Sequence, residues 1–94
     1  MTKLELIREI SSKADITPKV VGRVIDTVLE TIQEAAGRGE SVRIPGFGAF
    51  LVRRRAERQG RNIRTGEAIT IPAKKVVVFK SGKNLQEAVN QNED

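Results

Sequence analysis

Two runs of apolar residues at helical spacing occupy the first part of the chain. The first run is preceded by Thr2 and contains Glu5, the spacing of a capping box in which each side chain satisfies a backbone N–H of the first turn. Its apolar positions define one face of a helix and are Leu4, Leu6, Ile7, Ile10 and Ala14. The pattern stops at Asp15-Ile16, where we expect this helix to end.

The second run predicts a longer helix. It begins at Thr17-Pro18, because threonine is a good N-cap and proline is favoured at the first helical position. It ends at Gly37-Arg38-Gly39. Its apolar stripe is broader than one neighbouring helix would cover and comprises Val20, Val21, Val24, Ile25, Val28, Leu29, Ile32, Ala35 and Ala36. We therefore predict an antiparallel helix pair over residues 1–39 that also serves dimerisation.

The hydrophobic period changes from helical to alternating at residue 40. Residues 41–44 alternate and end at a proline, which suits a short strand, and a tight turn follows with Phe47 directed inward. On the next strand Phe50 faces inward, whereas Leu51 lies on the other face, exposed or at a partner contact. The apolar run Val76-Val77-Val78-Phe79 suits a buried strand. Residues 40–52 and 73–80 are therefore expected to form the body of an antiparallel sheet.

Residues 53–72 contain almost nothing that could enter a core, and they predict a β-hairpin that extends from the sheet as an arm. The turn lies within residues 60–66, residues 67–71 form the return strand, and Pro72 interrupts pairing. A two-stranded hairpin is only marginally stable alone in water. We therefore expect the arm to be mobile until it binds a partner.

A short helix over residues 82–89 completes the predicted elements. We expect Ser81 to cap it, and Leu85, Ala88 and Val89 to face inward. The predicted fold class is α+β, in a single domain spanning residues 1–94. It comprises two N-terminal helices, a three-stranded antiparallel sheet extended into the β-arm, and the short C-terminal helix.

The body offers more apolar surface than it can cover. Without the arm about 75 residues are left, near the size at which a single core is marginal. Yet these residues include a broad helical stripe, three phenylalanines and the 76–79 run. An intertwined homodimer would bury this surface and would carry two arms related by twofold symmetry. A heterodimer with a related chain is the alternative.

Positive charge is concentrated after the helices. The net charge is +5, but residues 1–37 hold five basic and six acidic side chains, whereas residues 38–83 hold twelve basic and three acidic. The arm contains six arginines between Arg53 and Arg64, against Glu57. Guanidinium groups contact phosphate bidentately, so we expect the arm to bind a polyanion, either nucleic acid or an anionic membrane surface. For any single arginine, a solvated strand edge that discourages aggregation is the alternative.

The positions within the arm refine this expectation. Alternation puts Arg53 and Arg55 on one face and Arg54 on the other. Ile63 has no obvious core to enter, so it either inserts as a wedge between base steps or packs on the hairpin itself. Asn62 supplies a groove hydrogen bond or only a turn conformation.

The chain lacks the residues that most enzymes and metal sites use. It has no cysteine and no histidine, which excludes disulfides, thiolate ligands and the commonest general base. No nucleophile stands beside a base, so we expect no catalysis, cofactor, metal or small-molecule substrate. No apolar run approaches the roughly 18 residues that cross a bilayer, and no signal pattern is present. We expect a cytoplasmic protein with no membrane partner.

Spaced motifs run through the second half of the chain. They are Gly46-Phe47-Gly48-x-Phe50, Gly60-Arg61-Asn62, Thr65-Gly66-Glu67, Ile71-Pro72-Ala73 and Phe79-Lys80-x-Gly82-Lys83-x-Leu85. In order and spacing they resemble the bacterial histone-like HU and integration host factor family, over essentially the whole chain. The resemblance implies an intertwined dimer whose β-arms embrace double-stranded DNA in the minor groove and bend it.

The resemblance also implies which residues contact DNA. The arm residues are Arg53, Arg55, Arg58, Arg61, Asn62, Ile63, Arg64 and Thr65, and those that face the backbone beneath are Lys3, Lys74, Lys75, Lys80 and Lys83. One position departs from the family pattern, because the intercalating proline is replaced by Ile63. Isoleucine can still wedge but lacks the fixed φ of proline, which puts the strength of bending in question. Arg54 makes this arm more basic than in many members.

The leading hypothesis is an architectural protein of the nucleoid that binds double-stranded DNA and bends or compacts it with little sequence specificity. A site-specific DNA-bending factor akin to integration host factor is the alternative within the family. An RNA-binding or scaffolding module is the alternative from another class. The phenylalanines fall at expected core positions, which leaves no aromatic platform for stacking single-stranded bases.

Overall fold

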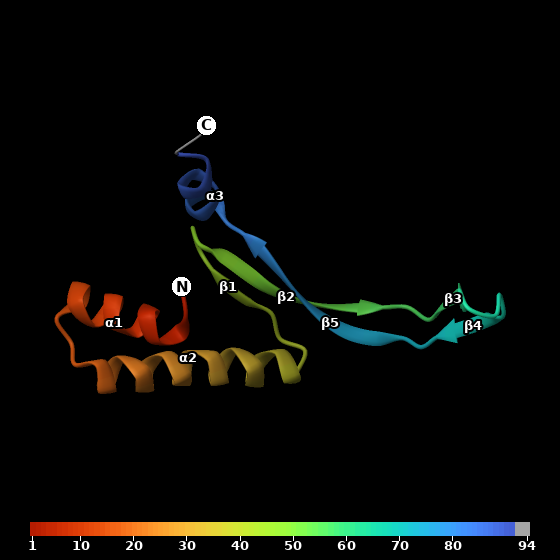
Figure 1. Ribbon diagram of the computed structural model, residues 1–94, viewed down its shortest axis with the longest axis horizontal. Coiled ribbons are helices and arrows are strands. Elements are labelled where there is room, and N and C mark those ends of the chain that lie inside the picture. Colours follow the sequence, from red (N-terminus) through yellow and green to blue (C-terminus); the bar gives the residue numbers. More distant parts are fainter. Residues whose placement is uncertain (92–94) are drawn as a thin grey trace. The chain divides into compact units, whose positions relative to one another are not determined.

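The computed structural model describes residues 1–91. The chain divides into two compact units, Met1–Ala35 and Ala36–Asp94. The first is helical, and the second holds all of the strands and the last helix (Figure 1). The α+β class predicted from the sequence is confirmed. Among the described residues, no helix is long and apolar enough to span a membrane.

The first helix begins and ends where its local sequence predicts. α1 spans Lys3–Ala14, and the Thr2 hydroxyl oxygen accepts a hydrogen bond from the Glu5 backbone N–H at 3.2 Å. The Thr2 hydroxyl in turn donates to the Glu5 carboxylate at 3.1 Å. Asp15 follows in the left-handed conformation with φ of 56°, which stops the helix.

The second helix, α2, spans Pro18–Gly37 and runs antiparallel to α1 (Figure 1). Ile7 of α1 lies over Gly22 of α2, where a Cβ atom on the glycine would stand 3.6 Å from the isoleucine Cδ1. At the other end of α1, Lys3 Nζ lies 2.6 Å from Asp26 Oδ1. The predicted helix pair is therefore joined by an apolar contact and an ion pair.

The predicted three-stranded antiparallel sheet is confirmed. Its strands are β1 (Val42–Ile44), β2 (Gly48–Arg55) and β5 (Lys74–Ser81), and β2 lies in the middle. β2 pairs with β5 along its whole length, from Gly48 opposite Ser81 to Arg55 opposite Lys74. The ladder therefore continues past residue 52 into the segment that we expected to be the arm.

Three phenylalanines cluster on one face of this sheet. Phe50 and Phe79 are directly opposed across β2 and β5, with ring centroids 5.0 Å apart. The ring of Phe47, in the turn before β2, lies 5.9 Å from that of Phe79. Phe47 is nevertheless 47% exposed and Phe79 is 41% exposed. The inward positions expected for them are thus only half covered in the single chain.

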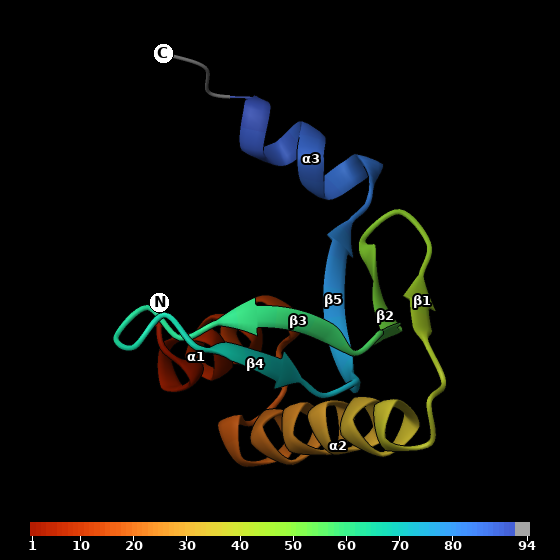
Figure 2. The same ribbon diagram turned by 90° about the vertical axis from the view of Figure 1, so that its right-hand side faces the viewer.

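The outer part of the arm is a separate ladder. β3 (Arg58–Arg61) pairs with β4 (Ala68–Ile71) in a two-stranded antiparallel sheet of its own. Residues 56–57 and 72–73 interrupt the strands between the two ladders. Figure 2 shows β3 and β4 running across the direction of β2 and β5. The hairpin that the sequence suggested is therefore divided in the middle, and Pro72 lies at the division.

The last helix, α3, spans Lys83–Asn90. Our expectation that Ser81 caps it was wrong: the N-cap is Gly82, and no side chain caps the first turn. The Ser81 hydroxyl instead accepts a hydrogen bond from the side chain of Gln86. The helix also leaves Val89 72% exposed in the single chain, where we expected it to face inward.

Very little of the chain is buried. Among the described residues, only Val21 and Ala35 form a buried apolar core. Large apolar side chains are exposed on both units, namely Met1, Leu4, Leu6, Ile16, Val20, Val24, Val28, Leu29, Ile44, Phe47, Ile63, Ile69, Val77, Phe79 and Val89. Apolar surface on this scale is unusual for a soluble monomer and marks an interaction surface.

Candidate nucleic-acid interface

One face of the β2–β5 ladder carries a row of cations. In an antiparallel pair, directly opposed residues share a face and alternate residues share it too. The register aligns Arg43 with Ala49 and Ala49 with Lys80, and further along it aligns Arg55 with Lys74. We call this surface the cationic face; its cations are Arg43, Arg53, Arg55, Lys74 and Lys80. The predicted separation of Arg53 and Arg55 from Arg54 agrees with this register.

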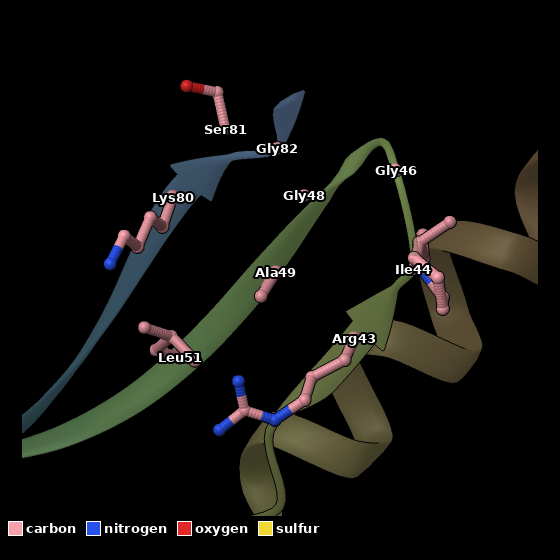
Figure 3. A pocket seen from close by; sticks show the side chains of 10 residues that line it. Arg43, Ile44, Gly46, Gly48, Ala49, Leu51, Lys80, Ser81 and Gly82 are labelled. Atoms are coloured by element: carbon pink, nitrogen blue, oxygen red, sulfur yellow. The ribbon is translucent and has the colours of Figure 1, made fainter. Parts of the chain in front are cut away.

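The body end of the cationic face is hollowed. A hollow of about 400 Å³ is lined by Arg43, Ile44, Pro45, Gly46, Gly48, Ala49, Leu51, Lys80, Ser81 and Gly82. Figure 3 shows the side chains of Arg43, Leu51 and Lys80 projecting beside it. Ala49 between the two cations leaves room for a ligand group to approach the sheet. Leu51, whose position the sequence left open, is half-buried there.

Arg43 is a cation of this surface that the sequence did not single out. It lies on the short edge strand β1, and its neighbours in the chain give no sign of its partner. Only the pairing of β1 with β2 and of β2 with β5 brings it into the row that ends at Lys80. The alternation around Arg43 was a signal that its side chain and that of Ile44 point to opposite faces.

The turn before β2 is fastened to the start of α3. The Gly82 N–H donates to the Phe47 carbonyl oxygen at 2.6 Å, and the Asn84 N–H donates to the Gly46 carbonyl oxygen at 3.0 Å. Gly46 has φ of +83°, and a Cβ atom on Gly82 would lie 2.9 Å from the Gly46 carbonyl oxygen. The two glycines thus allow a close approach of two backbones. It places Lys83, the first residue of α3, next to the end of β5.

The outer ladder has two different faces. Arg58 shares one face with Gly60, Ile69 and Ile71, and a Cβ atom on Gly60 would lie 2.9 Å from Ile71 Cδ1. The other face carries Arg61 together with Ala68 and the cross-strand neighbours Gln59 and Thr70. Arg58 and Arg61 therefore project from opposite sides of the β3–β4 ribbon. Together they can contact a ligand that encloses the ribbon on both sides.

The tip of the arm is closed by hydrogen bonds around Asn62. Its backbone N–H donates to the Glu67 carbonyl oxygen at 2.8 Å, and its carbonyl oxygen accepts from the Gly66 N–H at 2.7 Å. Its side-chain oxygen accepts from the Arg64 N–H at 2.9 Å. Ile63, which follows Asn62, is 101% exposed. The isoleucine side chain does not pack on the hairpin, which was one of its two expected roles.

The remaining predicted residues lie in different surroundings. The Thr65 hydroxyl accepts from the Glu67 N–H at 3.3 Å and so supports the tip. Lys75 is paired with Arg54, and both lie on the face of the β2–β5 ladder opposite the cationic face. Lys3 belongs to the helical unit, where it is paired with Asp26.

The positive charge of the arm is not neutralised by the chain itself. Within residues 1–91 the ion pairs are Lys3–Asp26 and Arg38–Glu40, and neither includes an arm residue. All six arm arginines have exposed side chains. In the same described range, no group of acidic side chains is arranged to hold a metal ion. The arrangement suits electrostatic binding of an extended polyanion.

Comparison with known proteins identifies the family. The family model described as bacterial DNA-binding protein matches residues 1–90. The chain belongs to this bacterial DNA-binding protein family, and the resemblance inferred from its motifs is confirmed.

The particular relatives are HU proteins. DNA-binding protein HU of Thermotoga maritima is 52% identical over 89 residues, which are 95% of this chain and 99% of the relative. DNA-binding protein HU of Staphylococcus aureus is 49% identical over the same shares of the two chains. Among solved structures, a cocrystal structure of Anabaena HU with DNA has a TM-score of 0.87 at 42% identity. It covers 96% of this chain and 98% of the other.

Proposed function

We propose that this protein is an architectural protein of the bacterial nucleoid that binds double-stranded DNA and bends or compacts it with little sequence specificity. The observation that carries the proposal is the arm, where five exposed arginines form no ion pair with a carboxylate of residues 1–91, namely Arg53, Arg55, Arg58, Arg61 and Arg64. Its minor-groove grip follows from this chemistry, because arginine enters a narrow groove and meets phosphates bidentately. The similarity to an HU protein cocrystallised with DNA supports it.

The proposed DNA contacts fall into two groups, which we call the grip and the base. The outer arm supplies the grip through Arg58, Arg61, Asn62, Ile63, Arg64 and Thr65. The cationic face supplies the base, joined by Lys83 at the start of α3. The family resemblance also implied DNA contacts for Lys3 and Lys75. Lys75, however, lies on the face of the β2–β5 ladder opposite this base. Most of these side chains are suited to phosphate, so they position the duplex without reading its sequence.

Low sequence specificity follows from the tip. The minor groove presents a degenerate hydrogen-bond pattern, so few side chains could distinguish bases there. Asn62 is the amide at the tip, and its side-chain oxygen is already engaged by the Arg64 N–H at 2.9 Å. Of the other contacts of the outer arm, the arginines are charged, Ile63 is apolar, and the Thr65 hydroxyl already accepts from the Glu67 N–H. A site-specific bender akin to integration host factor would need its preference to come from DNA deformability.

The functional unit is proposed to be an intertwined homodimer. Only Val21 and Ala35 are buried apolar residues in the described chain, and Val77 and Phe79 on the sheet are about half-exposed. A second copy would cover this apolar surface, as obligate dimer interfaces do. Twofold symmetry would then provide two arms for one duplex. A heterodimer with a related chain would cover the same apolar surface.

The proposal assigns the protein no catalytic activity and no cofactor. It acts by deforming DNA in the cytoplasm of a bacterium, and the fully exposed Ile63 at the tip is the wedge that unstacks a base step. The unstacking is compensated by contacts that the bent duplex makes along the arm and the cationic face.

The salt dependence of binding to random-sequence duplex tests the function. With six or more phosphate contacts, the affinity is expected to fall roughly a thousandfold between about 50 and 200 mM salt. Arg55→Ala and Arg58→Ala are each expected to weaken binding uniformly across sequences and to reduce the salt slope by about one. If one particular duplex stays bound in an excess of random-sequence duplex of the same length, the site-specific alternative is supported instead.

Two results would count against the proposed function. An affinity that hardly changes with salt would contradict an electrostatic grip on phosphates. Preference for single-stranded RNA over duplex DNA in the same gel-shift series would support the RNA-binding alternative.

A further inference from the structure

The face of the β2–β5 ladder opposite the cationic face also ends in two cations. Arg54 and Lys75 are directly opposed in the register, and both side chains are exposed. Towards the body, the same face continues with Val52 opposite Val77 and then with the two phenylalanines. The Arg54–Lys75 pair is therefore a polar end to an otherwise apolar face.

This pair is unfavourable for the free chain. Strands in a ladder are about 4.8 Å apart, and like charges directly opposite one another destabilise the pairing. Within the described part of the chain, neither Arg54 nor Lys75 forms an ion pair with a carboxylate. Two uncompensated positive charges held together in this way would be relieved by an anionic partner that reaches both.

The duplex held by the cationic face is not that partner at this position. The next pair along the ladder, Arg55 opposite Lys74, projects from the cationic face. Arg54 and Lys75 project from the reverse of the same two strands, because successive side chains of a strand point to opposite faces. One ribbon therefore presents two cationic pairs, back to back.

We propose that the Arg54–Lys75 pair binds the phosphate backbone of a second DNA duplex, so that the protein bridges two duplexes. This inference rests on the proposed function, since the first duplex is held by the arm and the cationic face. Along one strand of a duplex a phosphate recurs every ~3.4 Å of the helix axis, so neighbouring phosphates of one backbone can meet both cations. Binding the first duplex also raises the local concentration of other segments of the same DNA.

A pair of matched substitutions tests the bridge. Arg54→Glu reverses one charge and converts the like-charged pair into an ion pair with Lys75. Arg55→Glu makes the same change against Lys74, one residue along the same strands and on the cationic face. Both variants gain a similar cross-strand ion pair, so their stabilities and net charges stay matched.

Two measurements are made on wild type and on both variants. Binding to a single labelled duplex is measured in solution. Bridging is measured as the capture of a fluorescent duplex by beads that carry an unlabelled duplex already saturated with protein. Arg54→Glu is expected to reduce capture about tenfold and to change the single-duplex affinity by less than about threefold, whereas Arg55→Glu lowers the single-duplex affinity itself by about tenfold.

Three results would overturn the bridge while leaving the proposed function intact. They are no capture by the wild type, undiminished capture by Arg54→Glu, and a loss of single-duplex affinity in Arg54→Glu as large as in Arg55→Glu. Polyglutamate and excess duplex are also compared as competitors at equal charge concentrations. If polyglutamate releases only the captured duplex and excess duplex does not, the Arg54–Lys75 pair is assigned to an acidic protein instead. Absence of single-duplex binding by the wild type would reject the proposed function itself.

Discussion

At the tip of the arm, hydrogen bonds restrict the backbone, as the ring of a proline would. Asn62 holds Arg64, Gly66 and Glu67 through its side chain and its backbone. Gly66 adopts φ of +77°, which an L-residue with a side chain rarely takes. Ile63 is thereby presented outward by a closed loop, although nothing fixes its own φ covalently.

Removing the Asn62 side chain is expected to loosen the free tip. Asn62→Ala deletes the acceptor of the Arg64 N–H, so fast backbone motion at Ile63 and Arg64 increases. NMR order parameters measure this directly: values near ~0.85 indicate a rigid backbone and values below ~0.6 a flexible one. Asn62→Asp keeps an acceptor oxygen and serves as the control. Equal order parameters in wild type and Asn62→Ala would show that the backbone bonds alone hold the loop.

Shortening the wedge is expected to affect bending more than affinity. Ile63→Ala removes the apolar volume that would enter the base step but leaves every arginine in place. Energy transfer between the ends of a labelled duplex is expected to fall towards that of straight DNA, while the dissociation constant changes less than about fivefold. Ile63→Leu, which keeps the volume, is expected to bend like wild type. Full bending by Ile63→Ala would reduce the isoleucine to a turn residue.

Residue roles were predictable where the deciding partner is close in sequence. The Thr2–Glu5 cap and the start of α2 at Pro18 needed only local signals. Ser81 was misassigned because its hydroxyl had a competing partner in Gln86. Arg43 was missed because its place in one row with Ala49 and Lys80 depends on two strand pairings that link distant parts of the chain.

At the scale of elements, the arm is two ladders in series. The inner ladder, β2 with β5, has eight residues on each strand, and the outer ladder, β3 with β4, has four. The sequence predicted the hairpin and the effect of Pro72. It did not predict that the opposite strand would also be interrupted at residues 56–57, because only the register shows which residues face the proline.

The outer ladder is expected to open more readily than the inner one. It has only two short strands, and such hairpins are marginal in water. In hydrogen exchange, the amides of residues 58–61 and 68–71 are expected to exchange at least about tenfold faster than those of β2 in the free protein. Duplex DNA is expected to slow the outer amides selectively. Equal protection of both ladders without DNA would contradict this order of stability.

At the scale of the whole molecule, stability is expected to depend on association. The single chain leaves large apolar side chains uncovered, and Leu29 on α2 is 49% exposed. Since a dimer and its fold are formed together, the unfolding temperature is expected to rise with protein concentration. Concentration-independent unfolding would argue for a stable monomer.

A charge within the apolar stripe is expected to weaken the dimer. Leu29→Asp places a carboxylate among Ile25 and Ile32 of the α2 stripe, where burial against a partner would be costly. Sedimentation is expected to show at least about a hundredfold weaker association. Gln33→Asp, at an exposed position of the same helix, is the control and is expected to stay dimeric.

The division of the arm into two ladders has a consequence for how the protein would leave DNA. In the proposed complex, the interruptions at residues 56–57 and 72–73 would allow the outer ladder to release the minor groove while the inner ladder stays on the phosphate backbone. Departure then proceeds in stages, and a competing molecule can occupy the vacated groove before the arm returns. The residence time on a single DNA molecule is therefore expected to shorten as free protein is added, whereas a one-step departure would be independent of it.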